Sequence, residues 1–382
     1  MGDISSGDFK MEDLKIAQID VFQVDLPYAH GAYILSKGRS YKSFDSTIVR
    51  ITTQNGIEGW GEHVPFGADY IAAHALGVRA GIAEIAPKLI GLDPRRVDRI
   101  NEVMDNTLVG HEHAKSALDF ACWDIFGKAV GMPVCELLGG RTNESLPTIC
   151  TLSVGTPDKI RQDVTRYRSE GFTAFSVKIG AEDPSVDAAR VVAALADKKP
   201  GEFYLVDANG GMNVEGALRM LRLLPDGLDF VLEQPCATRR ECNSLRRRTN
   251  VAMVYDELAT NDASIVQMIA DDAAEGFTMK IGRAGGLTKA RRQRDMVLAA
   301  GWTISVMDPW MSEISFAAVV HLGQTIPSHS LHGVLDARKD NTFPTADGAF
   351  EAINGRVIAP SEPGLGITPR MNVLGKPVAS YC

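Results

Sequence analysis

The sequence has few cysteines, and their spacing matches no common motif. Six occur in 382 residues, without a C-x-x-C pair or a regular framework. C-x-x-C pairs are typical of zinc modules, and regular cysteine frameworks are typical of small secreted domains. Their absence argues against both classes and favours reduced thiols. No apolar signal segment precedes residue 15. We therefore predict a cytoplasmic protein, with residues 1–13 as a disordered leader.

An excess of positive charge and long hydrophobic runs are also missing. The formal net charge is −8, which argues against nucleic acid as a partner. The apolar runs fall short of the ~18 residues that a membrane span requires. The expected partner is a small molecule. The oligomeric state stays open, and a homo-oligomer is one alternative.

Short apolar runs are present instead, and a charged residue closes each of them. The runs are FSVK (175–178), YLVD (204–207), FVLE (230–233), MVYD (253–256) and FTMK (277–280), and ISVMD ends at Asp308. Short apolar runs between helical stretches are typical of buried parallel strands. A strand with its crossover helix needs roughly 25–30 residues, which fits this spacing. The pattern predicts a β/α barrel with charged residues at the strand ends, where such barrels keep their active sites.

The strand–helix pattern occupies the second part of the chain, which we assign as a barrel at residues 139–344. Its helices include segments at 157–170, 185–197, 214–224 and 287–300. Eight strands are expected at about 147–154, 173–179, 203–207, 229–233, 252–256, 276–281, 302–308 and 328–334.

The first part, residues 14–138, is predicted to be an α+β module. Residues 14–27 alternate in polarity like a strand, and Asn55-Gly56 is a strong hairpin turn signal between two further strands at 45–53 and 57–62. Helical periodicity follows at about 69–90, 95–107 and 112–130. We expect the Gly- and Pro-rich segment 345–382 to complete this capping module.

Three carboxylates close successive predicted strands, namely Asp207, Glu233 and Asp256. Adjacent strands lie ~4.8 Å apart, so these side chains can meet at one point. Carboxylate oxygens favour Mg²⁺ or Mn²⁺ over zinc. The sequence therefore predicts a divalent metal site. The polar residues one or two positions farther, Asn209, Gln234 and Glu257, fit hydrogen bonds to ligands or water, and a loop-structuring role fits them equally.

Two lysines flank the three carboxylates, with Lys178 one strand before them and Lys280 one strand after. A substrate carboxylate on the metal would present its α-carbon between them, and the metal would stabilise the enediolate formed when the α-proton leaves. The cation and the opposite ammonium would lower the pKa of either lysine, as a base requires. A purely charge-neutralising role for the lysines is the alternative.

These motifs together resemble the enolase superfamily, in particular its muconate-lactonising-enzyme-type subgroup within the mandelate racemase/muconate lactonizing enzyme family. The matching segments are V-K-I-G (177–180), V-D-A-N (206–209), E-Q-P (233–235), D-E (256–257) and K-I-G-R-A-G-G-L (280–287). The resemblance implies a (β/α)₇β TIM-like barrel with an N-terminal α+β capping domain. It also implies Lys178 and Lys280 as acid/bases.

Further segments are similar to the branch that acts on proline derivatives: 110–124, E-Q-P-C (233–236), D-P-W (308–310) and 363–369. The resemblance favours dehydration of a cis-3-hydroxyproline-like substrate. Racemisation or epimerisation of proline, proline-betaine or other N-substituted amino acids is the alternative, and a non-catalytic metal- or ligand-binding relative is a further one. Trp310 would face a cationic ammonium, or would be a core aromatic at the barrel mouth.

Some positions depart from the pattern of that branch. Ser176 stands where a Lys or Gln is common, which leaves the tuning of Lys178 open. Met311 and Ser312 replace two glycines after Trp310, and we expect them to fill space beside the substrate. Cap segments 27–42 and 63–70 are expected to close over the barrel mouth. A metal site at His111 and His113 is not expected, because no further ligands lie nearby in the sequence.

Overall fold

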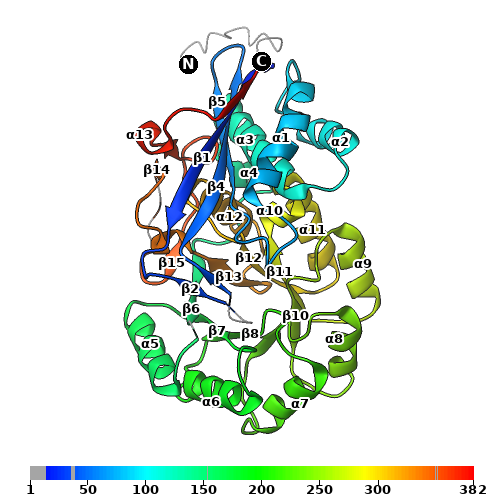
Figure 1. Cartoon of the computed structure of the whole chain (residues 1–382), viewed down its shortest axis with the longest axis vertical. Coiled ribbons are helices and arrows are strands. Elements are labelled where there is room, and N and C mark those ends of the chain that lie inside the picture. The colour runs from blue at the N-terminus through cyan, green and yellow to red at the C-terminus, as the bar shows by residue number, and fades with distance from the viewer. Residues whose placement is uncertain (1–13, 36–38, 153, 349, 351) are drawn as a thin grey trace, which may run out of the picture.

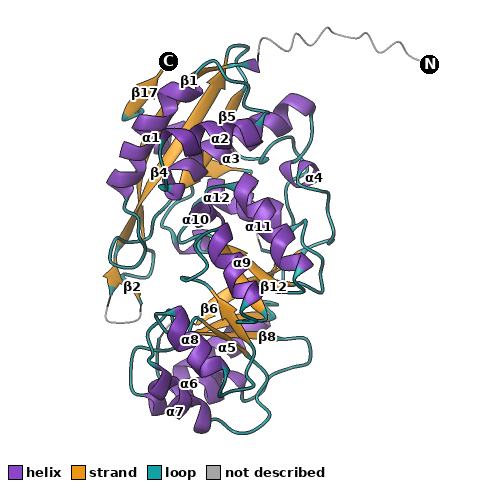
Figure 2. Cartoon of the chain, turned by 90° about the vertical axis from the view of Figure 1, so that its right-hand side faces the viewer, coloured by secondary structure: helices purple, strands orange, loops and turns teal. Residues whose placement is uncertain are grey.

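The computed structural model describes residues 14–35, 39–152, 154–348, 350 and 352–382. The leader predicted at residues 1–13 lies outside the described residues. A sheet with packed helices occupies one end of the long axis, and a barrel ringed by helices occupies the other (Figures 1 and 2). Among the described residues, no helix is both long and apolar enough to cross a membrane.

The sheet at the first end is an antiparallel meander, as predicted. Strand β1 (Ile16–Pro27) pairs with β4 (Ser43–Thr53), and β4 pairs with β5 (Glu58–His63). Asn55-Gly56 makes the turn between β4 and β5, and Gly56 has the positive φ of 84° that this turn needs. Strand β17 (Ala379–Tyr381) joins the free edge of β1 and so belongs to this sheet.

Helices α1 (Ala75–Leu89) and α3 (Glu112–Val130) pack on this sheet, and α2 (Val97–Thr107) packs on these two helices. The first begins later than the periodicity predicted, because the side chain of His74 caps its N-terminus and accepts a hydrogen bond from Gly77 N. Helix α3 ends at Gly131, which adopts a left-handed conformation.

Helix α3 lies directly on β5 because two glycines of that strand leave room for it. A Cβ at Gly61 would lie 1.9 Å from the carbonyl oxygen of Ala117, and one at Gly59 would lie 2.2 Å from that of Ala121. Side chains at these positions would therefore push the helix away from the strand. The close packing brings His113, in the first turn of α3, next to His63 at the end of β5.

The barrel confirms the predicted (β/α)₇β fold. Within the described chain, eight parallel strands form a closed cylinder in sequence order, and β13 pairs with β6. They are β6 (Leu146–Leu152), β7 (Ala174–Lys178), β8 (Phe203–Asp207), β9 (Val231–Glu233), β10 (Met253–Tyr255), β11 (Gly276–Lys280), β12 (Thr303–Met307) and β13 (Leu331–Leu335). The predicted strand limits agree with these to within three residues.

Helices follow the first seven strands. They are α5 (Pro157–Ser169), α6 (Pro184–Leu195), α7 (Val214–Arg222), α8 (Arg239–Arg246), α9 (Asp262–Ala270), α10 (Ile281–Ala284) with α11 (Leu287–Ala299), and α12 (Glu313–Gly323). Shorter elements complete the described chain: β2 (Tyr33–Ile34), β3 (Ser40–Tyr41), α4 (Val134–Leu137), the 3-10 helix Arg338–Asp340, β14 (Ala346–Asp347), β15 (Arg356–Val357), β16 (Thr368–Pro369) and α13 (Met371–Leu374).

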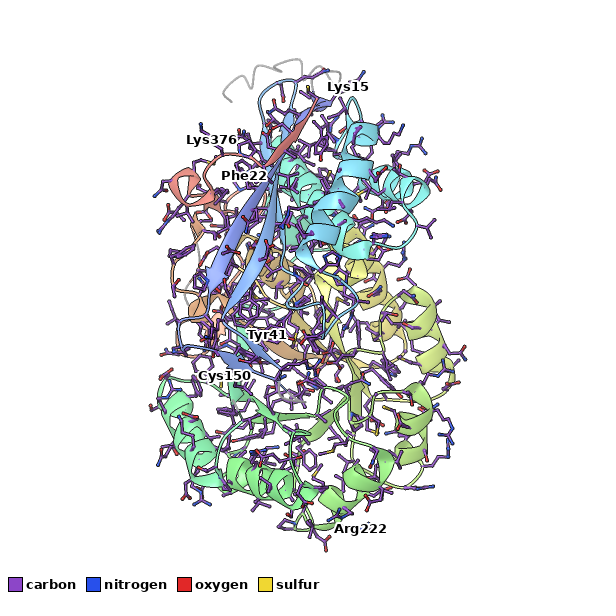
Figure 3. The ribbon with its side chains drawn as sticks, viewed as in Figure 1. Lys15, Phe22, Tyr41, Cys150, Arg222 and Lys376 are labelled. Carbon is purple, nitrogen blue, oxygen red and sulfur yellow. The ribbon has the colours of Figure 1, made fainter. Side chains whose placement is uncertain are left out.

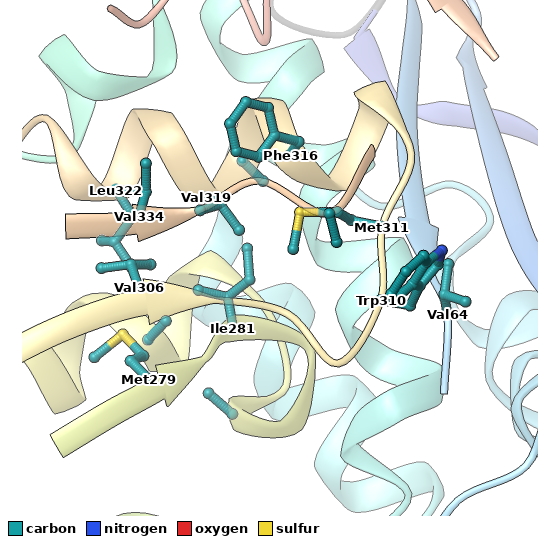
Figure 4. Packing of buried hydrophobic residues seen from close by; sticks show 14 of the residues in the cluster. Val64, Met279, Ile281, Val306, Trp310, Met311, Phe316, Val319, Leu322 and Val334 are labelled. Carbon is teal, nitrogen blue, oxygen red and sulfur yellow. The ribbon is translucent and has the colours of Figure 1, made fainter. Parts of the chain in front are cut away.

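The two parts share one continuous apolar core. Every residue of α12 is buried, and Figure 4 shows its Phe316 and Val319 near Met311 and Ile281. In Figure 3, Tyr41 lies between the sheet and the barrel, whereas Arg222 marks the far end of the barrel. Each of the six cysteines falls within the described residues, and none of them forms a disulfide there.

Candidate active site

The five charged residues that close the predicted runs lie at one end of the barrel. Lys178, Asp207, Glu233 and Lys280 are the last residues of their strands, and Asp256 follows β10 directly. Lys178 is paired in register with Asp207, and Asp207 with Glu233. All five line one cavity of about 310 Å³. The five residues that the sequence spacing singled out therefore share one site, because parallel strands in register bring their ends to the same depth in the barrel.

Each lysine forms an ion pair with a carboxylate. The ammonium of Lys178 contacts Asp207 Oδ2, and that of Lys280 lies 2.5 Å from Asp256 Oδ2. Burial lowers the pKa of Lys178, but the neighbouring charges, Asp207 first among them, together with the hydrogen bond to Asp207 raise the pKa above the usual range. Burial raises the pKa of Asp256, and Lys280 and Arg283 reverse this, so that its pKa falls below the ordinary value.

Glu233 lies between these two ion pairs without a cation of its own among the described residues. Burial raises its pKa well above the usual range, and the neighbouring charges of Asp207 and Asp256 raise it further. Three buried carboxylates at adjacent strand ends suit the oxygen-rich coordination of a hard divalent cation. Within the described residues, no three such side chains already form a compact ligand cluster, and lysines contact oxygens of two of the carboxylates.

The polar residues that follow the carboxylates connect neighbouring strand ends. Gln234 Oε1 accepts hydrogen bonds from the backbone N–H groups of Asp256 and Leu258, and its Nε2 donates to Cys236 O. Gln234 is fully buried and does not line the cavity. It holds the loop that carries Asp256, which fits the loop-structuring alternative.

Asn209 and Glu257 form a second network at the cavity wall. Asn209 Nδ2 donates to Glu257 Oε1 at 3.0 Å, and Asn209 Oδ1 accepts from Lys178 Nζ at 3.3 Å. The hydroxyl of Tyr70 donates to Glu257 Oε1 at 2.6 Å and accepts from Lys280 Nζ at 3.0 Å. The network therefore links both lysines to a tyrosine of the cap.

Asp308 and Trp310 both line the cavity after β12. Asp308 Oδ1 accepts from Gly282 N at 2.8 Å, and burial raises the pKa of Asp308 to about 8. Trp310 stacks on Phe44 with ring centroids 3.9 Å apart, and its indole N–H donates to Asn341. Phe44 thus covers one face of the indole. Of the two alternatives for Trp310, a core aromatic at the barrel mouth fits better than an open face that binds a cation.

The expectation for Met311 and Ser312 was wrong. Both side chains are fully buried and neither lines the cavity. Met311 packs in the apolar core, and Ser312 caps the N-terminus of α12. Ser312 and Ser315 donate hydrogen bonds to the buried carboxylate of Glu62 on β5. The two substitutions therefore connect the barrel to the cap and take no space from a substrate.

Sequence reasoning missed several residues of the site. Arg283 donates to Asp256 Oδ1 at 2.8 Å from the short helix α10, and its position three residues after Lys280 was a signal for it. The cap segments that were expected to close over the barrel mouth contribute Tyr28, His30, Tyr33, Phe66 and Tyr70 to the lining of the cavity. His63 does not line it, and lies between His113 and Asp308 instead.

Comparisons with known proteins agree with this geometry. Residues 159–373 match the model "Enolase C-terminal domain-like", and residues 28–139 match "Mandelate racemase / muconate lactonizing enzyme, N-terminal domain". The chain is 40% identical to a cis-3-hydroxy-L-proline dehydratase from Roseibium aggregatum, over 96% of this chain and 100% of that protein.

Two solved structures are similar over nearly the whole chain, and both are described as mandelate racemase/muconate lactonizing enzymes. The protein from Aspergillus oryzae is 62% identical, with a TM-score of 0.92 over 97% of this chain and 100% of that one. The protein from Roseovarius nubinhibens, complexed with magnesium, is 47% identical, with a TM-score of 0.94 over the same shares.

Proposed function

Because the chain belongs to the mandelate racemase/muconate lactonizing enzyme family of the enolase superfamily, we propose that it removes the α-proton of an amino-acid-type carboxylate. The proposed reaction is the dehydration of a cis-3-hydroxyproline-like substrate, and Mg²⁺ is the proposed cofactor. Full-length similarity to a cis-3-hydroxy-L-proline dehydratase supports the substrate class. The observation that supports this proposal most directly is the pair of lysines on either side of three buried carboxylates in one cavity.

Asp207, Glu233 and Asp256 are the proposed metal ligands. The raised pKa of Glu233, caused by burial and by the two neighbouring carboxylates, is relieved when positive charge is added among them. Bound Mg²⁺, or Mn²⁺ in its place, supplies positive charge that balances the charge developing on the substrate carboxylate as the α-proton leaves. Arg283 holds Asp256 from the side opposite Lys280, through the other carboxylate oxygen.

Lys178 and Lys280 are the proposed acid/bases. They close β7 and β11, so the three carboxylate-bearing strand ends lie between them. One lysine removes the α-proton from one side of the substrate, and the other is held at the opposite side. Tyr70 and Asn209 keep the two ammonium groups in place through the hydrogen bonds described above.

The cavity provides partners for the ring and the amine of a proline-like substrate. Tyr28, Tyr33, Phe66 and Trp310 form an aromatic wall with edge-to-face contacts. Such a wall favours an apolar ring and a nearby positive charge.

Racemisation or epimerisation is the second candidate, because two lysines on opposite sides also allow one to remove a proton and the other to return one. A hydroxyl on the β-carbon decides between the two reactions, since it offers a leaving group. The same active site would then exchange the α-proton of a substrate that lacks this hydroxyl.

Proton NMR in D₂O with Mg²⁺ tests the proposal. The substrates are cis-3-hydroxy-L-proline, the proline enantiomers and their betaines. We expect a dehydrated product only from the 3-hydroxy compound, whereas compounds without this hydroxyl should at most exchange the α-proton. Lys178→Ala and Lys280→Ala should abolish dehydration, whereas Lys376→Ala, at an exposed position, should not change it. No exchange with any compound would refute the proline-derivative assignment.

A further inference from the structure

Three titratable side chains that the proposed reaction leaves unused lie in a row across the boundary between cap and barrel. Asp308 follows β12 and lines the cavity. Its Oδ2 lies 3.7 Å from Nδ1 of His63, at the end of β5. His63 Nε2 lies 2.8 Å from Nδ1 of His113, which is partly exposed in the first turn of α3 next to the exposed His111. The row therefore runs from the cavity to the protein surface.

Two atoms in this row lack hydrogen-bond partners. The side chains of His63 and Asp308 are 0% exposed, and His63 Nδ1 and Asp308 Oδ2 have no partner among the described residues. A buried polar atom left without a partner costs roughly 1–3 kcal/mol. Here two such atoms face each other, and a shift of less than 1 Å would join them by a hydrogen bond.

Gly282 leaves the space that this arrangement needs. A Cβ at Gly282 would lie 2.3 Å from His63 Nδ1 and 2.8 Å from Asp308 Oδ1. The imidazole and the carboxyl group thus pack directly on the backbone that follows the proposed base, Lys280. Any larger residue at position 282 would displace one of them.

The environment favours a proton on Asp308 and neutral imidazoles. Burial raises the pKa of Asp308 to about 8, although the N–H of Gly282 and the charges of Lys280 and Arg283 act against it. Burial lowers the pKa of His63 to about 3. Burial also lowers that of His113 well below its ordinary value, and His63, Arg283 and Lys280 add to this. A neutral imidazole can take up a proton at one nitrogen while it releases one from the other.

We propose that Asp308 is the acid that protonates the departing β-hydroxyl, and that His113 and His63 return a proton to it from solvent. This inference rests on the dehydratase function proposed above. In the proposed step, a lysine takes the α-proton, the C–O bond breaks, and the hydroxyl leaves as water with the proton of Asp308. A proton then moves from solvent through His113 and His63 to the carboxylate, and the lysine returns its proton to solvent.

The first test separates proton removal from loss of water. Cis-3-hydroxy-L-proline is incubated with Mg²⁺ in D₂O, and NMR follows both α-proton exchange and product formation. In Asp308→Asn, water loss should fall by about 100-fold, a usual effect of removing a general acid. Exchange of the α-proton should continue at a similar rate, because both lysines remain. An unchanged rate of water loss, or an equal loss of both rates, would overturn the role of Asp308.

The second test addresses the two histidines. His113→Ala should slow water loss severalfold in dilute phosphate buffer, and added imidazole should restore the rate by taking the place of the missing ring. The control His329→Ala, at an exposed position, should show neither effect. His63→Gln should slow water loss without imidazole rescue, because position 63 is closed to solvent. A His113→Ala rate that imidazole leaves unchanged would indicate a structural role only.

The wild-type enzyme keeps the two proposals apart. If it exchanges the α-proton but releases no water, the dehydratase proposal fails, and with it this role of Asp308. If it releases water and the Asp308→Asn variant does so equally fast, the relay alone is overturned. Thermal unfolding with and without Mg²⁺ shows whether each variant folds and binds the metal.

Discussion

Removal of the Glu62 carboxylate should loosen the connection between cap and barrel. This fully buried group accepts five hydrogen bonds: Oε1 from Ser46 Oγ at 2.7 Å, and Oε2 from the N–H groups (3.1 and 3.0 Å) and hydroxyls (both 2.8 Å) of Ser312 and Ser315. At roughly 1 kcal/mol net for each bond, less the relieved cost of burying a carboxylate, Glu62→Ala should lower the free energy of unfolding by about 3–5 kcal/mol.

Glu62→Gln is the matched control. Its amide oxygen can accept the same four hydrogen bonds from Ser312 and Ser315, and its NH₂ group can donate to Ser46 Oγ. We expect a loss of only about 1 kcal/mol. Urea unfolding followed by circular dichroism measures both variants. A loss below 1 kcal/mol in Glu62→Ala, or equal losses in the two variants, would refute the proposed role of this carboxylate.

Three further changes test other parts of the structure. Gly61→Ala forces a Cβ to 1.9 Å from Ala117 O, and urea unfolding should show a loss of about 3 kcal/mol. His321 accepts from Cys135 N inside the core, and burial lowers its pKa from 6.5 to about 4. Only the unfolded chain takes up this proton between those values, so stability should fall as pH drops, by about 2 kcal/mol at pH 5, and His321→Gln should flatten that slope. Mg²⁺ at a hundred times its Kd should add about 2.7 kcal/mol by calorimetry, and Glu233→Gln should reduce this gain.

The strand ends were predictable because each apolar run stops at a charged residue. In a parallel barrel this local pattern also fixes depth, so Asp207, Glu233 and Asp256 came together as the spacing indicated. The regular spacing of the strands along the sequence predicted the barrel fold for the same reason.

Contacts between distant segments could not be predicted in this way. Tyr70 and Lys280 are 210 positions apart in the sequence and form a hydrogen bond, and the hydrophobic periodicity of the sequence does not predict such a contact. Met311 and Ser312 were misjudged because adjacency to Trp310 in the sequence says nothing about the direction of a side chain. In the structure, both turn away from the cavity, and the cap carboxylate Glu62 decides the conformation of that turn.

The pairing of β17 with β1 has a consequence for biosynthesis. Ile19 lies opposite Tyr381, so roughly 360 residues are translated between the two partners. At ~5–20 residues per second, the outer edge of β1 waits roughly 20 to 70 s on the ribosome before its partner exists. An unpaired strand edge is a template for pairing with other chains. We therefore expect the yield of the folded cap to depend on chaperones or low temperature.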